Sequence, residues 1–226
     1  MRWIYRVERK LGRNFGVSNI MLYITATMLA FYVTWLIIMP GLYELISFNR
    51  WLILDGEVWR AITFLLIPYN IGSPFFVLLS LFIAYRIGTS LEQLWGKTLF
   101  NMYLFFGAVG AIIAGFIAGF ATNYYLFLSI ILAFCYINPN ATFLLFFILP
   151  IKAKHIAFIN WALYIWSFIQ ASLRGDLRDQ MAIIFSLINF FLFFGPNVWR
   201  TMRQNYNTLR RRREYMKSWG DQNPWR

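Results

Sequence analysis

Six stretches of the chain are apolar over lengths near the roughly 20 residues that a helix needs to cross a membrane. We expect membrane spans at residues 20–39, 74–91, 99–120, 124–137, 156–173 and 181–199. Only 13% of the residues are charged, about half the share in a soluble protein, so polar side chains are too few to cover a globule. The sequence therefore predicts an all-α polytopic membrane protein.

The first and fourth runs need separate treatment. The first is too long for a signal peptide and five more runs follow it, so we expect it to stay in the membrane. The fourth, 124–137, would reach only about 21 Å as a helix. Either this segment lies inside the bundle, or its boundaries are wrong.

The distribution of Lys and Arg predicts the orientation, because these residues collect in short cytoplasmic loops. With six spans and a cytoplasmic N-terminus, 17 of the 21 basic residues fall inside. We therefore expect a basic cytoplasmic segment (1–19), a membrane domain (20–199) and a basic cytoplasmic tail (200–226). A count of five spans would leave the basic tail outside. The expected location is the cell membrane of a bacterium.

The composition also limits the chemistry. A single histidine, His155, excludes every metal site or catalytic scheme that needs two, so no cofactor and no metal are expected. The net charge of +12 and the arginines at 210–213 suggest nucleic acid at first. The Trp, Tyr and Met residues among them favour the membrane surface instead, and a solvated, positive-inside tail explains the charges. Specific binding of the tail to anionic lipid or to the ribosome is the alternative.

Two structural features are expected within and between the spans. The connection 40–73, here called the L1 element, is too apolar for a solvated loop and should lie in the membrane interface as short helices. Within it, Trp59 and Arg60 taken alone match an aromatic belt residue beside a snorkelling arginine. The third span has small residues at every fourth position, which predict one packing groove for a neighbouring backbone: Gly107, Ala111, Gly115 and Gly119.

Three blocks of sequence resemble the rhomboid-like superfamily, which contains the rhomboid intramembrane proteases and the derlins. Residues 56–63, GEVWRAIT, resemble its G-Q-x-W-R-x-x-T. Residues 88–100, GTSLEQLWGKTLF, followed by Tyr103, resemble its G-x-x-L-E-x-x-x-G-x-x-x-F and the tyrosine that comes after it. Residues 138–151, NPNATFLLFFILPI, are similar to F-P-N-A-x-x-L-L-F-F-x-I-P-I. The resemblance implies a six-helix bundle. The motif residues that it marks as candidates for partner binding are Gly56, Glu57, Trp59, Arg60, Gly88, Glu92, Gly96, Pro139 and Asn140. Glu92 is costly in lipid and must find a partner, for which the backbone of the next turn and Lys97 are the candidates. We expect it to act as a structural clamp, with an interfacial anchor as the alternative.

The catalytic positions of the family are replaced in this chain. The serine position falls at or near Tyr124, and the histidine of the sixth helix falls near Ile183. The two groups that stabilise the oxyanion correspond to Phe76 and Ser80. The resemblance therefore implies a derlin-like pseudoprotease, with no catalytic residue, that binds or escorts transmembrane client proteins in protein quality control.

Two alternatives remain open. One is a divergent intramembrane serine peptidase that uses Ser80 or Ser129 without a histidine. The other is a structural or lipid-handling subunit of a membrane complex.

Overall fold

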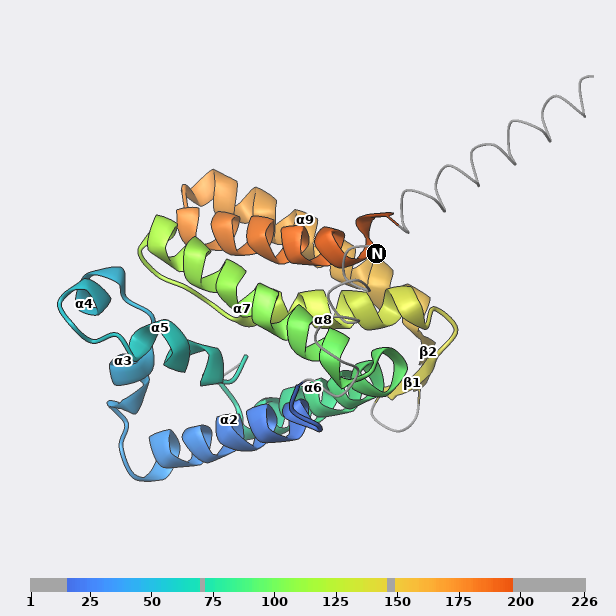
Figure 1. The fold of residues 1–226 in the computed structure, drawn as a ribbon, viewed down its shortest axis with the longest axis horizontal. Helices are drawn as coiled ribbons and strands as arrows, with labels where there is room; N and C mark the ends of the chain where they lie inside the picture. Colours follow the sequence, from blue (N-terminus) through green and yellow to red (C-terminus); the bar gives the residue numbers. More distant parts are fainter. Residues whose placement is uncertain (1–15, 70–71, 146–148, 197–226) are drawn as a thin grey trace, which may run out of the picture.

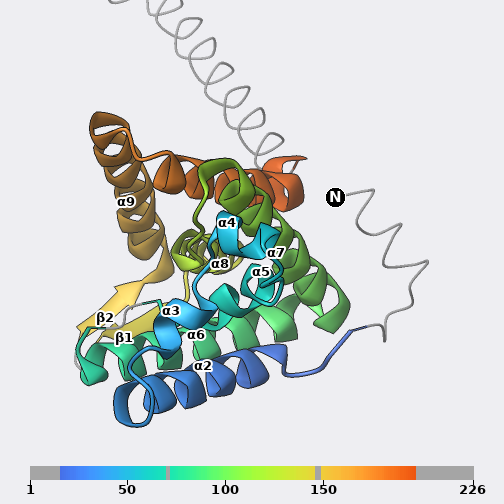
Figure 2. The ribbon, with the colours of Figure 1, turned by 90° about the vertical axis from the view of Figure 1, so that its left-hand side faces the viewer.

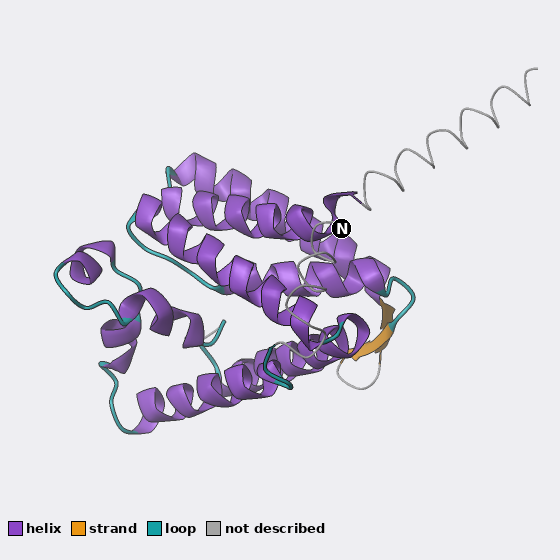
Figure 3. Cartoon of the chain, in the orientation of Figure 1, coloured by secondary structure: helices purple, strands orange, loops and turns teal. Residues whose placement is uncertain are grey.

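The computed structural model describes residues 16–69, 72–145 and 149–196. Most of this part is helical, with one pair of strands at an end of the bundle (Figure 3). The predicted basic N-terminal segment falls largely outside the described residues, and the basic tail, including the arginines at 210–213, falls wholly outside them.

In the described part of the chain, five helices are long and apolar enough to cross a membrane. They are α2 (Ile20–Ile37), α6 (Pro74–Trp95), α7 (Lys97–Ala118), α9 (Ala153–Arg174) and a last helix, Leu177–Pro196. Each coincides with one of the predicted spans to within a few residues. The prediction of a helical, multi-pass membrane protein is therefore confirmed.

The short helix α8 (Tyr124–Ile137) lies inside the bundle. Its boundaries are those expected from the sequence, and it packs against α6, α7 and α9 (Figures 1 and 2). Most of its side chains are buried, so it needs little contact with lipid. At 14 residues it reaches about 21 Å, which is less than a bilayer core. Six crossings consequently stay a prediction.

Proline and glycine set several helix ends. Pro74 starts α6, where its fixed φ and missing N–H cost nothing. Gly96 has a φ of +85° and reverses the chain directly from α6 into α7. Gly119 and Gly175 end α7 and α9 in the left-handed conformation that a glycine adopts without strain.

Helices α2 and α6 lie side by side along one edge of the molecule (Figures 1 and 2). A carboxylate oxygen of Glu92 accepts a hydrogen bond of 2.7 Å from the backbone N–H of Asn19, at the start of α2. A Cβ on Gly88 would lie 2.0 Å from Cγ of Met21, so only glycine permits this close contact. Glu92 thus connects two helices through the backbone of Asn19, and the expected partners, the next turn and Lys97, are corrected accordingly.

The L1 element contains four short helices: α3 (Leu42–Ile46), α4 (Arg50–Leu54), α5 (Arg60–Thr63) and the 3-10 turn η1 (Phe64–Leu66). In Figure 1 they lie between the splayed far ends of α2 and α7. Phe48, Ile53 and Phe64 are buried and pack with Ala111 of α7. The L1 element is therefore folded against the bundle, in the short helices that its apolar content predicts.

An antiparallel hairpin joins α8 to α9. Its strands, β1 (Thr142–Leu145) and β2 (Leu149–Lys152), pair Thr142 with Lys152 and Leu145 with Leu149. The chain is predominantly helical, as predicted, but the all-α prediction did not include this hairpin. A short, continuously apolar run does not distinguish a strand from a helix or an interfacial loop.

The small residues of α7 do not form the single groove that their spacing predicts. A Cβ on Gly107 would meet Leu126 of α8 and Asn189 of the last helix, whereas one on Gly115 would meet Phe48 of the L1 element. Gly119 has no atom within 4 Å of the Cβ position and serves as the end of the helix. The prediction of one helix-packing stripe is corrected to separate contacts and a helix terminus.

Candidate functional site

One buried arginine holds the L1 element together. Arg60, the first residue of α5, is 4% exposed. Its guanidinium donates to the backbone oxygens of Glu44 and Ser47 and forms an ion pair with Glu57. A planar, five-donor guanidinium suits this set of acceptors. Arg60 therefore joins α3, the following turn and α5, and does not snorkel toward the membrane surface.

Neighbouring residues complete this arrangement. The Thr63 hydroxyl donates to the backbone oxygen of Ile46 at 3.0 Å, and the Trp59 indole N–H donates to that of Leu45 at 3.3 Å. The Trp59 ring is still 52% exposed, so it offers a rigid, amphipathic face on the outside of the element. Gly56, with a φ of +113°, makes the turn between α4 and α5.

Arg50 attaches the L1 element to the end of α7. Its backbone N–H donates to Gly119 at 2.9 Å and its guanidinium donates to Phe116 at 3.0 Å, in both cases to a backbone oxygen. Carbonyls in the last turn of a helix have no partner within the helix, so these bonds cap α7.

Asn123 makes the corresponding attachment at the start of α8. Its side-chain amide donates to the backbone oxygens of Leu65 and Ile67, at 3.0 and 2.8 Å. Asn123 is 6% exposed, so these bonds form within the protein interior. Together with Arg50, it fixes the L1 element to the bundle at two points.

Four buried hydroxyl groups meet where four helices converge: Tyr103 of α7, Ser129 of α8, Tyr164 of α9 and Ser186 of the last helix. This hydroxyl cluster contains two pairs, Tyr103 with Ser129 and Tyr164 with Ser186, the latter at 2.9 Å. The Ser129 hydroxyl also donates to the backbone oxygen of Ser186 at 3.4 Å and links the pairs. Polar groups at this depth are expensive unless bonded, and these bond to one another.

Two buried asparagines lie beside the hydroxyl cluster. The Asn160 amide donates to Leu128 at 3.0 Å, and the Asn189 amide donates to Tyr103 at 3.3 Å, both to backbone oxygens. Their side-chain carbonyl oxygens have no hydrogen-bond partner among the described residues. The asparagines add polar contacts between helices, at the cost of two buried acceptors that remain unpaired.

The hydroxyl cluster does not contain the groups of a hydrolase. A serine nucleophile needs an adjacent base, and every member of the cluster is a neutral hydroxyl. His155, the one histidine of the chain, is exposed near the beginning of α9. Among the described residues, no three His, Cys, Asp or Glu side chains gather as a metal site would require.

None of the four positions matched to rhomboid catalytic residues belongs to the hydroxyl cluster. Phe76 is 52% exposed on α6, and the Ser80 hydroxyl donates to Val77 of its own helix at 2.8 Å. Tyr124 is the half-buried first residue of α8. Ile183 is buried, and its backbone oxygen accepts a bond of 3.2 Å from the Ser186 hydroxyl.

The third block of the family pattern lies at the turn before the hairpin. Pro139 and Asn140 are both exposed there. The backbone oxygen of Pro139 accepts from Lys154 at 3.1 Å, and that of Ala141 accepts from Ala153 at 2.7 Å. These bonds fix the start of α9 against the end of α8, so the turn has a structural role.

Sequence reasoning named Ser129 as a possible nucleophile and Tyr103 as a motif residue, but it did not pair them and it missed Tyr164 and Ser186. Tyr103, Tyr164 and Ser186 are polar residues inside apolar runs, a pattern that marks sites in membrane proteins. That signal was present in the sequence, but it does not show which polar residues face one another. Comparison with family models, curated proteins and solved structures finds no match to this chain.

Proposed function

We propose that the protein is a rhomboid-like pseudoprotease that binds or escorts transmembrane client proteins without cleaving them. The observation that carries this proposal is the state of Ser129. Its hydroxyl is buried at 1% exposure, is bonded to Tyr103 and donates to a backbone oxygen. A serine in this position stabilises a bundle and has no free base to activate it.

In this proposal both ends of the chain lie in the cytoplasm, because 17 of the 21 basic residues then lie on the cytoplasmic side. In a Cys135-free background, cysteines placed at Ser47 and Asp176 are expected to react with an impermeant reagent from outside. One placed at Ser218 should react only after the cells are opened. Labelling of Ser218 in intact cells would refute the six-span topology.

The surface best suited to a client helix is α9. It has the smallest buried share of the five long helices, and it packs against α8, β2 and the last helix. Large apolar side chains stand exposed along it, among them Phe158, Ile165 and Trp166. Helices associate in membranes through close packing, because lipid tails are as apolar as the side chains that they cover. A second helix can therefore replace lipid on this face at little cost.

Site-specific crosslinking tests client binding. A photoreactive residue at Trp166 on α9 or Trp59 in the L1 element should crosslink to a single-span rhomboid substrate reconstituted with the purified protein. The control is Tyr23 on α2, which is similarly exposed at 60%. We expect several-fold more product at the first two positions, and an uncleaved substrate. Equal crosslinking at all three positions would contradict the proposal.

The alternative enzyme, an intramembrane peptidase acting through Ser129 or Ser80, makes a different prediction. A fluorophosphonate probe would then label the purified protein, and labelling would disappear in Ser129→Ala or Ser80→Ala. We expect no such labelling. If the substrate is neither cleaved nor crosslinked, the remaining reading is a structural or lipid-handling subunit.

A further inference from the structure

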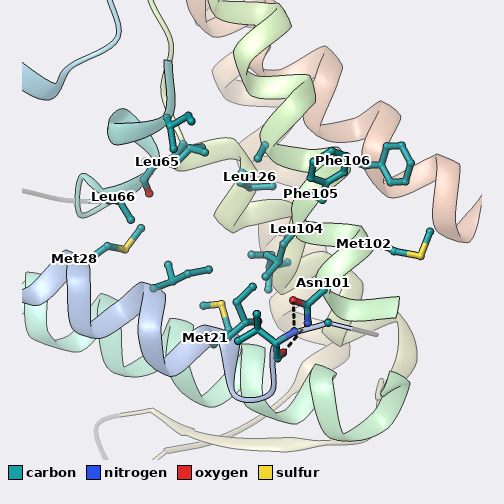
Figure 4. Close-up of a pocket in the computed structure, with 18 of the residues that line it drawn as sticks. Met21, Met28, Leu65, Leu66, Asn101, Met102, Leu104, Phe105, Phe106 and Leu126 are labelled. Carbon is teal, nitrogen blue, oxygen red and sulfur yellow. Dashed lines mark hydrogen bonds between the residues drawn. The ribbon is translucent and has the colours of Figure 1, made fainter. Parts of the chain in front are cut away.

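A cavity of about 870 Å³ lies between α2, α7 and the L1 element (Figure 4). Its walls are almost wholly apolar. Met21 and Met28 come from α2, Leu104 and Phe105 from α7, and Leu65 and Leu66 from the L1 element. The volume is in the range of specific small-molecule sites.

The cavity has two defined ends. At one end, the side chain of Asn101 of α7 accepts a hydrogen bond of 3.2 Å from the backbone N–H of Val17 and donates one of 3.0 Å to its backbone oxygen (Figure 4). These bonds connect the segment before α2 to α7 and close this end of the cavity. At the other end lie Leu65 and Leu66, in a segment that Asn123 holds in place. The α7 wall runs from Thr98 to Ala108, which is about 15 Å at the rise of a helix.

This length is about half of a bilayer core. The cavity starts at Gly16 and Val17, just before α2 begins, so its depth matches the leaflet on that side. One side opens to the membrane, because the lining residues Phe105 and Ile62 are 64% and 65% exposed. The floor is closed by Met21 and Met28, each 1% exposed. Tyr69, also in the wall, stays neutral because burial raises the pKa of its phenol.

A spanning client helix does not fit this space. Such a helix is about 10 Å wide and needs a path of about 30 Å, but Leu65 and Leu66 close the cavity halfway. Water has almost no polar partner on these walls. An acyl chain, by contrast, has the right chemistry, enters sideways from the bilayer and is about as long as one leaflet is deep.

We infer that the cavity is a binding site for an acyl chain of an anionic phospholipid from the leaflet on the N-terminal side. The preference for an anionic headgroup follows from the balance of charge in the sequence next to its polar end. Lys97 begins α7, and the residues that precede Gly16 in the sequence contain five basic residues and one acidic residue. The carboxylate of Glu92 offsets only one of these positive charges. Basic residues beside a membrane attract anionic lipid.

Photolabelling with a defined lipid tests the site. The full chain is reconstituted in phosphatidylcholine vesicles that contain phosphatidylglycerol with a diazirine on one acyl chain, and labelled peptides are mapped by mass spectrometry. Label should concentrate on residues 20–28 and 98–108. A phosphatidylcholine probe with the same chain should label these peptides several-fold less. Label spread evenly over the exposed face of α9 would overturn the site, and equal labelling by both probes would overturn the headgroup preference.

A filling variant gives a second test. Ala108→Phe places a ring in the cavity and should reduce labelling of 98–108 by roughly fivefold or more, equivalent to a clear loss of affinity. The control Ala162→Phe adds the same ring on the exposed face of α9 and should leave labelling unchanged. Unchanged labelling in Ala108→Phe, or displacement of the wild-type label by a transmembrane peptide, would show a different occupant and overturn the inference. The mapping in the wild type decides the question even if Ala108→Phe does not fold.

Discussion

Replacing Arg60 by alanine is expected to lower the free energy of unfolding by about 2 to 4 kcal/mol, because several buried acceptors lose their donor at once. The backbone oxygens of Glu44 and Ser47 would be left in the L1 element without the guanidinium. Glu57 is about one-third exposed, so its stranded carboxylate can reach water and adds less than a fully buried charge would. Unfolding of the purified protein in mixed micelles measures the change.

Two substitutions provide the comparison. Arg178→Ala removes an arginine that is 48% exposed and lies 3.6 Å from Asp176 and Asp179, so it should cost less than about 1 kcal/mol. Arg60→Lys keeps the charge but not the fork of donors, and should recover only part of the loss. If Arg60→Ala is no more destabilising than Arg178→Ala, the L1 element does not depend on this network.

The long helices could be predicted from sequence because membrane spans depend on local properties. The length of each apolar run sets a helix, and residues such as Pro74 and Gly119 set its ends. The expectation that 124–137 either lies inside the bundle or is misplaced is resolved in favour of the bundle interior. These predictions need no knowledge of which helix contacts which.

The candidate sites could not be predicted in the same way, because they depend on pairs of residues far apart in the chain. Arg60 looks like an interfacial arginine until α3 brings the carbonyl of Glu44 to it. The hydrogen bond between Tyr164 and Ser186 joins two apolar runs. Nothing in the sequence of either run indicates which residue of the other run its polar side chain contacts. The spacing of small residues on α7 predicts close packing but does not name Phe48 as the group that approaches.

The hydroxyl cluster and the cavity also use two neighbouring faces of α8. Ser129 fastens α8 to α7 and the last helix through hydroxyl contacts. Leu126 and Ile130, on the adjacent face, form part of the apolar cavity wall. A short central helix can therefore stabilise the bundle through polar contacts and still present an apolar surface to a lipid chain.

Replacing Gly115 by leucine is expected to destabilise the protein by about 1 to 3 kcal/mol through overpacking. Even a Cβ at this position would lie 2.7 Å from two ring atoms of Phe48 and 2.8 Å from Cβ of Ala121, closer than such atoms approach. Phe48 has little room to move, since its ring packs edge-on against Phe64 and Phe116 with centroids 5.3 and 5.4 Å away. Leucine would therefore push the L1 element away from α7.

The same helix offers a matched control in Gly110. A Cβ there would lie 3.6 Å from Cβ of Phe185, an ordinary van der Waals distance. Gly110→Ala should therefore be neutral or stabilising by up to about 1 kcal/mol, the gain in helix propensity, while Gly115→Ala should already destabilise.

Phe48→Ala empties the space that a residue at 115 would enter, so Gly115→Leu should cost clearly less in that background than in the wild type. Because Phe48 belongs to the L1 element and Gly115 to α7, a coupling of this kind would measure how firmly the element is seated. Additive losses, or equal effects of alanine at 110 and 115, would mean that Phe48 does not pack on this glycine.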